Sequence, residues 1–188
     1  MRLIVSFLML SVLMLLMPTP LAAQVSEWAP DNNLIQAARG GYIGTMRQEL
    51  LRGANVNAFG RGGVPPLLAA AEGGQPRSVE FLLEEGALPD LYDKKKRTAL
   101  GIAVRGGHTE IVEILLGAGA DANKYHSSGD SALRVAVRFG YIEIVSKLLE
   151  HDADVWDTDI TGRTALDLAR ETRNPNPTLI DLLESKSN

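Results

Sequence analysis

The chain lacks several residue types and motifs on which many enzymes and secreted folds depend. None of its 188 residues is cysteine, which excludes disulfides, a lipidated cysteine, a thiol nucleophile and any cysteine-ligated metal. No Asn-x-Ser/Thr acceptor for N-linked glycans occurs, because Asn176-Pro177-Thr178 is blocked by its proline. Aromatic residues make up only 5% of the chain, while 45% of it is hydrophobic and 18 residues are glycine. This composition favours a folded domain of small helices joined by tight turns over a large aromatic core.

Residues 1–23 have the pattern of a secretory signal peptide. Arg2 supplies a positive charge, an uncharged apolar run covers residues 3–17, and Leu21-Ala22-Ala23 offers small residues to a peptidase. The alternative is an uncleaved membrane anchor, but a run of about 15 apolar residues is shorter than the roughly 20 that a helix needs to cross a bilayer. We therefore expect cleavage at or close to Ala23, and no stable membrane insertion of the mature chain.

The charge balance is acidic. The sequence carries 19 basic and 23 acidic residues, a net charge of −4. Removing residues 1–23 takes away one basic residue, Arg2, and no acidic one, so the mature chain has a net charge of −5. Non-specific binding to nucleic acid is not expected of such a chain. The absence of disulfides and glycosylation acceptors favours the bacterial periplasm over a eukaryotic secretory route, and we expect a periplasmic or secreted protein.

The strongest positive signal is a repeat of 33 residues. Four kinds of position recur in one register, which chance does not produce. The columns are Leu67, Leu100, Leu133 and Leu166; Ala37, Ala70, Ala103, Ala136 and Ala169; Gly41, Gly74, Gly107 and Gly140; and Ala54, Ala87, Ala120 and Ala153.

One period of this repeat predicts two short helices. The first begins at Thr98, whose hydroxyl can cap it, and ends at Gly106-Gly107, where glycine tolerates the left-handed conformation of a helix end. The second covers His108 to Leu116, with apolar residues at the spacing of one helical face. Each helix is too short to be stable alone, so stacking of the units has to supply the core. The alanine and leucine columns are therefore predicted to be buried between units.

These units resemble the ankyrin family, whose repeats carry a Thr-Pro-Leu-His signature and a Gly-Ala-Asp-x-Asn ending. The signature is found as Pro65-Pro66-Leu67-Leu68, Thr98-Ala99-Leu100-Gly101, Ser131-Ala132-Leu133-Arg134 and Thr164-Ala165-Leu166-Asp167. The ending is found as Gly53-Ala54-Asn55-Val56-Asn57 and Gly119-Ala120-Asp121-Ala122-Asn123, with looser copies at Gly86-Ala87-Leu88-Pro89-Asp90 and Asp152-Ala153-Asp154.

The resemblance implies an all-α ankyrin-repeat solenoid of about five stacked helix-turn-helix units with hairpin loops. After the signal peptide at 1–23 and a short linker at 24–30, we expect the ankyrin-repeat domain at 31–188. Its units are expected at about 31–57, 58–90, 91–123, 124–156 and 157–188.

The chain also departs from the family pattern. No unit keeps the signature histidine, so its hydrogen bonds have to be replaced or lost. Asp152 stands where a left-handed glycine is usual, and we expect the fourth unit to be less stable than the third for that reason. Asp31 is expected to cap the first helix of the first unit. In the fifth unit, Asn174-Pro175-Asn176-Pro177 breaks the register by about one residue, as a terminal, capping unit allows.

No arrangement of residues for catalysis, a cofactor or a metal is found. Residues 157–162 imitate the opening of a calcium loop, but the twelfth position is Leu168 where a bidentate glutamate is needed. Asp159 and Gly162 are better interpreted as turn residues of a hairpin. The glycine-rich run at 60–63 lacks the preceding strand that a phosphate loop requires. The three histidines, His108, His126 and His151, take three different places in the repeat. We expect no enzyme activity, no cofactor and no metal site.

The resemblance implies a protein–protein interaction scaffold. The chain resembles small exported bacterial ankyrin proteins. This resemblance implies a scaffold that is exported to the cell envelope and supports a periplasmic partner enzyme. The alternative is a secreted effector or toxin-neutralising protein that acts on a foreign target protein. Fold alone does not choose between these roles.

In the ankyrin arrangement the hairpin tips and the exposed ends of the first helices form one concave face, and here those positions are basic and aromatic. The predicted partner-binding residues are Phe59, Arg61, Tyr92, Lys94, Lys95, Arg97, Arg105, Tyr125, Arg138 and Phe139. The alternative for residues 94–97 is a merely solvated hairpin tip. We predict that the protein is a monomer, that it binds an acidic surface of another protein, and that this association weakens as the salt concentration rises.

Overall fold

The computed structural model describes residues 29–60, 62–124, 130–172 and 175–187. In these residues the chain forms ten α-helices and no strand. The helices are α3 (Ala29–Gly40), α4 (Ile43–Leu51), α5 (Pro66–Glu72), α6 (Pro76–Glu84), α7 (Ala99–Gly106), α8 (Thr109–Gly117), α9 (Ala132–Phe139), α10 (Ile142–Glu150), α11 (Ala165–Glu171) and α12 (Pro177–Ser187). The predicted all-α fold class is confirmed, whereas the predicted signal peptide lies outside the described residues.

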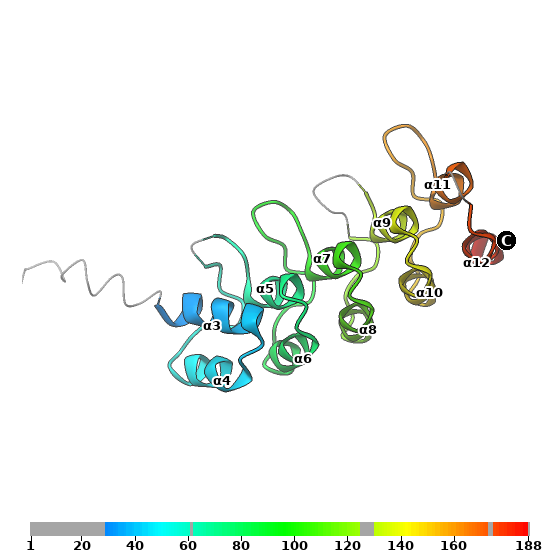
Figure 1. Cartoon of the computed structure of the whole chain (residues 1–188). Helices are drawn as coiled ribbons and strands as arrows, with labels where there is room; N and C mark the ends of the chain where they lie inside the picture. The colour runs from blue at the N-terminus through cyan, green and yellow to red at the C-terminus, as the bar shows by residue number, and fades with distance from the viewer. Residues whose placement is uncertain (1–28, 61, 125–129, 173–174, 188) are drawn as a thin grey trace, which may run out of the picture.

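The helices form two parallel rows, and the chain alternates between them (Figure 1). The first row contains α3, α5, α7, α9 and α11, and each helix packs against the next in the row. The second row contains α4, α6, α8, α10 and α12, packed in the same way. The connections between units rise as loops on the side of the first row (Figure 1). The molecule is therefore an elongated stack in which each unit contacts its neighbours.

The helix ends follow the predicted chemistry in the central units. Thr98 caps α7, with its hydroxyl accepting a hydrogen bond from the backbone of Gly101 at 3.2 Å. Ser131 caps α9 in the same manner, and Thr164 forms a capping box with Asp167 at α11. Gly107 ends α7 with a φ of 69°, in the left-handed region.

The core is formed by the repeating columns. Leu100 and Leu133 are 2% and 1% exposed, and Ala103 and Ala136 are fully buried. The prediction that these columns lie between units is confirmed for the central units, whereas Leu166 of the terminal unit is only half-buried. The buried columns thus join each unit to its neighbours, while the two helices of each unit also pack against each other.

The first-row helices approach so closely that one position tolerates no side chain. A Cβ added to Gly73, at the end of α5, would lie 2.1 Å from the backbone oxygen of Arg39 in α3. Gly73 has a φ of −78°, which any residue can adopt, so the requirement for glycine here comes from the neighbouring unit. The contact fixes how α3 and α5 stack.

A ladder of polar side chains joins the loops that follow the second-row helices. Asn57 accepts a hydrogen bond from the backbone of Leu88 at 2.9 Å, and Asn123 accepts one from Asp154 at 2.8 Å. Between them, Asp90 accepts one from the backbone of Asp121 at 3.0 Å. Each bond crosses from one unit to the next, so the last residue of the family ending holds the register of the stack.

Two predictions about special residues have different outcomes. Asp31 does not cap the first helix: α3 already begins at Ala29, and Asp31 lies in its first turn. Its carboxylate instead accepts a hydrogen bond from the backbone of Asn55 at 2.8 Å, which ties α3 to the loop after α4. Asp152 does adopt the left-handed conformation expected of it, with a φ of 59°. The predicted lower stability of the fourth unit stays a prediction.

Candidate protein-binding face

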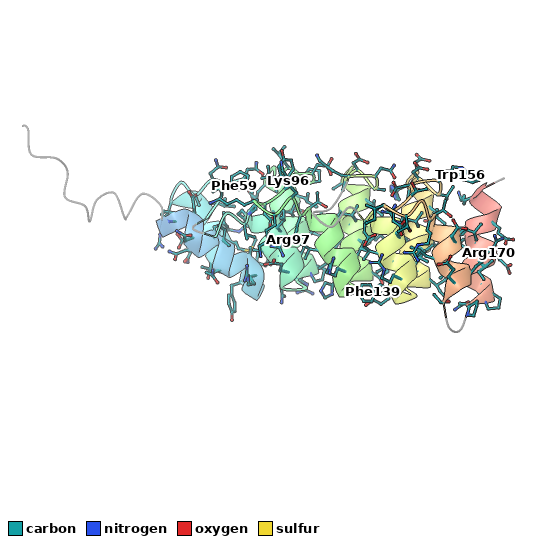
Figure 2. The ribbon with its side chains drawn as sticks, turned by 90° about the horizontal axis from the view of Figure 1, so that it is seen from above. Phe59, Lys96, Arg97, Phe139, Trp156 and Arg170 are labelled. Carbon is teal, nitrogen blue, oxygen red and sulfur yellow. The ribbon has the colours of Figure 1, made fainter. Side chains whose placement is uncertain are left out.

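The hairpins lie on the side of the first-row helices α3, α5, α7, α9 and α11 (Figure 1). We call the surface formed by the hairpins and the exposed side of these helices the inner face. Figure 2 views it from above, with Phe59 and Lys96 toward the hairpin edge, Arg97 centrally and Phe139 at the opposite edge. Eight of the ten predicted partner-binding residues are described, and Arg61 and Tyr125 lie outside the described residues. Seven of the eight are exposed and Arg97 is half-buried. Their partner-binding role stays a prediction.

The hairpin of the third unit is built around the buried carboxylate of Asp93. Asp93 is 3% exposed and accepts hydrogen bonds from the backbones of Lys95, at 2.8 Å, and Arg97, at 3.0 Å. Burial alone would raise the pKa of Asp93, but the hydrogen bonds from Arg97 and Lys95 outweigh it and hold this pKa below its usual value. Because the carboxylate points inward, Lys94 and Lys95 project into solvent.

Arg97 is engaged within the chain. Its Nη2 lies 2.7 Å from Oδ2 of Asp93, and its Nη1 lies 2.8 Å from Oε1 of Glu72 in the preceding unit. Glu72 also accepts from Nη2 of Arg39 at 2.8 Å. One carboxylate therefore links arginines of the first and third units across the second. This arrangement gives Arg97 a structural role in joining the units.

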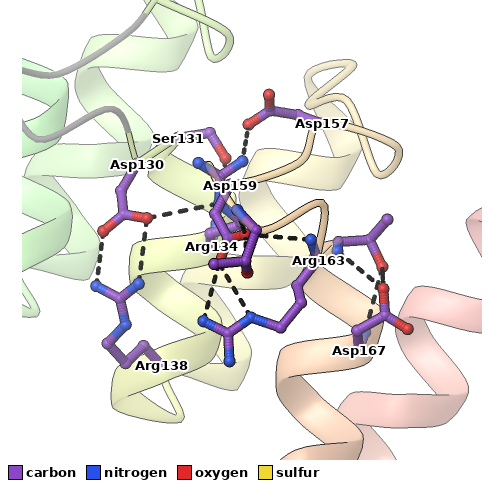
Figure 3. A network of polar contacts seen from close by, with 10 residues as sticks. Asp130, Ser131, Arg134, Arg138, Asp157, Asp159, Arg163 and Asp167 are labelled. Carbon is purple, nitrogen blue, oxygen red and sulfur yellow. Dashed lines mark hydrogen bonds and ion pairs between the residues drawn. The ribbon is translucent and has the colours of Figure 1, made fainter.

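Arg138 is likewise engaged with a carboxylate of its own unit. It donates to both carboxylate oxygens of Asp130, at 2.7 and 3.1 Å (Figure 3). The hydrogen bond from Arg138 is the main cause that holds the pKa of Asp130 below its usual value. A bidentate pair of this kind is strong and directional, so the charge of Arg138 is largely compensated before a partner arrives.

The same network contains a buried arginine that the sequence analysis did not single out. Arg134 is 0% exposed, and its guanidinium forms ion pairs with Asp130 and with Asp157 in the hairpin of the fifth unit (Figure 3). Arg134 occupies the position of the missing signature histidine. In the fourth unit a side chain at this position thus joins two neighbouring units. The signal in the sequence was a charged residue at a core position, four residues after Asp130.

The hairpin of the fifth unit, whose Asp157 pairs with Arg134, is built around the carboxylate of Asp159. Asp159 accepts hydrogen bonds from the backbones of Thr161 and Arg163, at 2.7 and 3.1 Å, and from the side chains of both residues. The Thr161 hydroxyl is the main cause that lowers the pKa of Asp159. Its oxygens point into a turn that ends at Gly162, as predicted for a hairpin. Among the described residues no group of three or more metal-binding side chains gathers.

The predicted aromatic residues are partly held by their own unit. Tyr92 is 43% exposed, and Nζ of Lys96 lies 4.1 Å from the centre of its ring. Phe139 is 50% exposed and stacks on Tyr141 with ring centres 5.6 Å apart. Each ring keeps one face supported and much of its surface in solvent. Large, orientated aromatic surfaces of this kind are common energetic centres of protein interfaces.

A groove of about 460 Å³ lies on the inner face between the second and fourth units. Its charged and apolar walls are formed by Glu72 of α5, Lys95 and Arg97 of the third hairpin, Ile102 and Arg105 of α7, and Val135 of α9. Lys95 and Arg105 are exposed and have no ion-pair partner among the described residues. The groove therefore carries uncompensated positive charge above an apolar floor.

Comparison with known proteins supports the assignment of the repeat. A family model of ankyrin repeats in three copies matches the chain twice, over residues 34–126 and 67–159. The two matches together span residues 34–159, which is more than half of the chain. No curated protein matches the chain significantly.

Proposed function

The chain belongs to the ankyrin-repeat family and is a protein–protein interaction scaffold; from this premise, we propose that its inner face binds an acidic surface of a partner protein. The family resemblance seen in the repeated columns is confirmed. Proteins of this family are generally binding scaffolds without catalysis. We accordingly assign the chain no enzyme activity, no cofactor and no metal.

One observation carries the choice of face and of partner charge. The groove on the inner face holds Lys95 and Arg105 without carboxylate partners in the described chain, although acidic residues outnumber basic ones over the whole sequence. A charge left unpaired on an otherwise acidic molecule attracts a carboxylate-rich surface and orients it during encounter. The exposed rings of Phe59, Tyr92 and Phe139 supply apolar contact area beside these charges.

The charge of the inner face is not uniform, which places the partner over the central units. Toward the C-terminus, Arg134, Arg138 and Arg163 are each held by aspartates. Toward the third hairpin, Lys94, Lys95 and Arg105 are exposed. An acidic partner is therefore attracted to the groove and the third hairpin more than to the fifth unit.

We propose export to the periplasm, where a monomer supports a partner enzyme of the cell envelope. The signal-peptide pattern of residues 1–23 supports export. No helix in the described part of the chain is long and apolar enough to span a bilayer.

Fractionation of the host separates this proposal from the alternative of a secreted effector: recovery from the medium, and not from the periplasm, favours the effector. Mass spectrometry that finds an intact Met1 on a membrane-bound protein contradicts export with cleavage.

The binding face is tested with two matched triple variants. The first replaces Phe59, Tyr92 and Arg105 with alanine on the inner face. The second replaces the exposed residues Leu51, Arg77 and Glu84, which lie in α4 and α6 of the second row. Affinity for a partner captured from envelope extract should fall for the first variant and stay unchanged for the second. If the folded inner-face variant binds as tightly as the wild type, the second-row helices carry the interface and the proposal fails.

A further inference from the structure

We propose that the groove of the inner face binds an extended acidic segment of the partner, whose carboxylates pair with Arg105 and Lys95 and whose apolar side chain packs on Ile102 and Val135. This inference rests on the proposed function and makes it specific. It commits to a short peptide segment that enters the groove, in contrast to a broad acidic surface laid across the hairpins.

The groove contains two kinds of positive charge. Arg97 already lies 2.7 Å from Asp93 and 2.8 Å from Glu72, so it serves to hold the wall. Glu72 is itself bound to two arginines and has its charge compensated. Arg105 and Lys95 form no ion pair with any described residue. An entering carboxylate therefore gains its attraction from Arg105 and Lys95, and Arg97 acts as a positioning residue.

The shape of the groove depends on a glycine at a position that larger side chains fill in both neighbouring units. Gly101 lines the groove, whereas the equivalent positions hold Leu68 in the second unit and Arg134 in the fourth, both fully buried. Gly106 also lines the groove, and the ring of His108 lies against it and forms part of the wall. At Gly101 the third unit thus lacks a side chain that its neighbours have, which leaves room for a side chain of a partner.

The apolar floor makes a purely charged ligand a poor match. Ile102 is half-buried and Val135 is 3% exposed, and both face the groove between charged walls. An apolar side chain placed there removes further apolar surface from water, which favours binding. A segment with acidic residues on both sides of one apolar residue satisfies the walls and the floor together.

The charge of the remaining surface disfavours a long polyanion as the occupant. The exposed sides of the second-row helices carry Glu80, Glu84, Glu110, Glu113 and Glu143. A nucleic acid or an anionic membrane is large enough to extend past the groove toward these glutamates, whereas a short segment inside the groove contacts Lys95 and Arg105 directly, and charges beyond a Debye length of about 8 Å are largely screened.

The test uses three fluorescein-labelled peptides of equal length and the full mature chain. Their central sequences are Glu-Glu-Leu-Glu-Glu, Gln-Gln-Leu-Gln-Gln and Glu-Glu-Ser-Glu-Glu, each flanked by glycine and serine. Fluorescence anisotropy should show the first peptide binding about tenfold more tightly than the second, and measurably more tightly than the third. Equal affinities for the first two peptides, or no binding of the first, overturn the inference.

A charge-reversal variant with a matched control assigns the binding to the groove. Arg105→Glu should weaken binding of the acidic peptide by about tenfold or more, while Arg77→Glu, at an exposed arginine of α6, should change it by less than about twofold. Urea unfolding of both variants establishes that they fold. If Arg105→Glu binds the acidic peptide as tightly as the wild type, the groove is not its site. A salt-sensitive dimer that Arg105→Glu abolishes would make a second copy of the chain the occupant, which also overturns the inference.

The same variants separate failure of this inference from failure of the proposed function. A captured natural partner whose binding is lost with Tyr92→Ala but kept with the double variant Lys95→Glu and Arg105→Glu would refute the groove and leave the inner face as the interface. A partner that binds both variants as tightly as the wild type would refute both.

Discussion

Arg134 of α9 donates from Nη1 to the carboxylate of Asp157, in the hairpin of the next unit, from a side chain that solvent does not reach. The pair joins the fourth and fifth units at a position where the second unit has only Leu68. Removing Arg134 takes one positive charge away from two partly buried aspartates, Asp130 and Asp157. The last unit is thus joined to the fourth by a buried ion pair in addition to apolar packing.

Arg134→Ala should therefore destabilise the chain by about 3–5 kcal/mol, as for other buried ion pairs from which one partner is removed. Arg138→Ala, on the same helix but with a side chain 47% exposed, should cost under about 1 kcal/mol. Urea unfolding measures both. Similar costs for the two variants would contradict the structural role given to Arg134.

The close approach of α3 and α5 gives a second prediction. Gly73→Ala places a Cβ 2.1 Å from the backbone oxygen of Arg39, so the two helices have to separate, and we expect a loss of about 1–3 kcal/mol. Gly117→Ala, in α8, meets nothing within 4 Å and should stabilise the chain by about 0.4–1 kcal/mol. Thermal unfolding of the pair checks the sign of each change. Destabilisation by Gly117→Ala, or none by Gly73→Ala, would show that the stacking is different.

Asp152 offers a test of backbone strain. Its φ is 59°, and the equivalent residues Gly53, Gly86 and Gly119 have φ values of 91°, 89° and 85°. Asp152→Gly should raise the free energy of unfolding by about 1 kcal/mol, because the left-handed conformation is unfavourable for a residue with a Cβ. The Asn123 side chain bonds the backbone oxygen of residue 152 and is unaffected by the change. Unchanged or lower stability in urea would refute the prediction, and with it the expectation of a weakened fourth unit.

The pH dependence follows from the aspartates of the hairpins and caps. Asp93, Asp130 and Asp167 all have pKa values below the usual range, mainly through hydrogen bonds that outweigh burial. Because the folded-state values are depressed, their stabilisation is complete above the unfolded pKa of about 3.9 and is lost as pH falls through the folded values. The melting temperature should be nearly constant from about pH 7 to about pH 5 and fall below that.

Asp93→Asn provides the control for this acid sensitivity. The variant should be less stable at neutral pH, since the amide cannot form the ion pair with Arg97. It should also lose less stability than the wild type on acidification, because one of the titrating groups is gone. An equal loss in both proteins would mean that Asp93 contributes nothing to acid unfolding.

The features that recur in several units were predicted best from the sequence. The buried Leu100 and Leu133 and the left-handed Gly107 were predicted correctly. Each of these residues belongs to a column with members in other units, so every member supports the others. Asp31 was misplaced because the first unit has no preceding hairpin, and its carboxylate is used by Asn55 instead. Repetition thus predicts the shared framework and gives no guidance at the ends.

The distinction between engaged and available arginines could not be predicted. Arg97 and Arg105 look alike in the sequence, and both were expected to bind a partner. Only the structure places Glu72 2.8 Å from Arg97 and leaves Arg105 exposed beside the groove. Which rotamers bring a carboxylate of one unit to an arginine of the next depends on stacking geometry, which no residue pattern in a single chain specifies.

We assign the contact with the partner to the inner face and not to the second row of helices. It is tested most directly by replacing Tyr92, on the inner face, or Leu51, exposed on α4 of the second row, with the photo-crosslinking amino acid p-benzoylphenylalanine in the native host. Irradiation of living cells followed by mass spectrometry identifies what each position touches. We expect a covalent adduct with one partner protein from position 92 and none from position 51. An adduct from position 51 alone, or the same adduct from both positions, would contradict it.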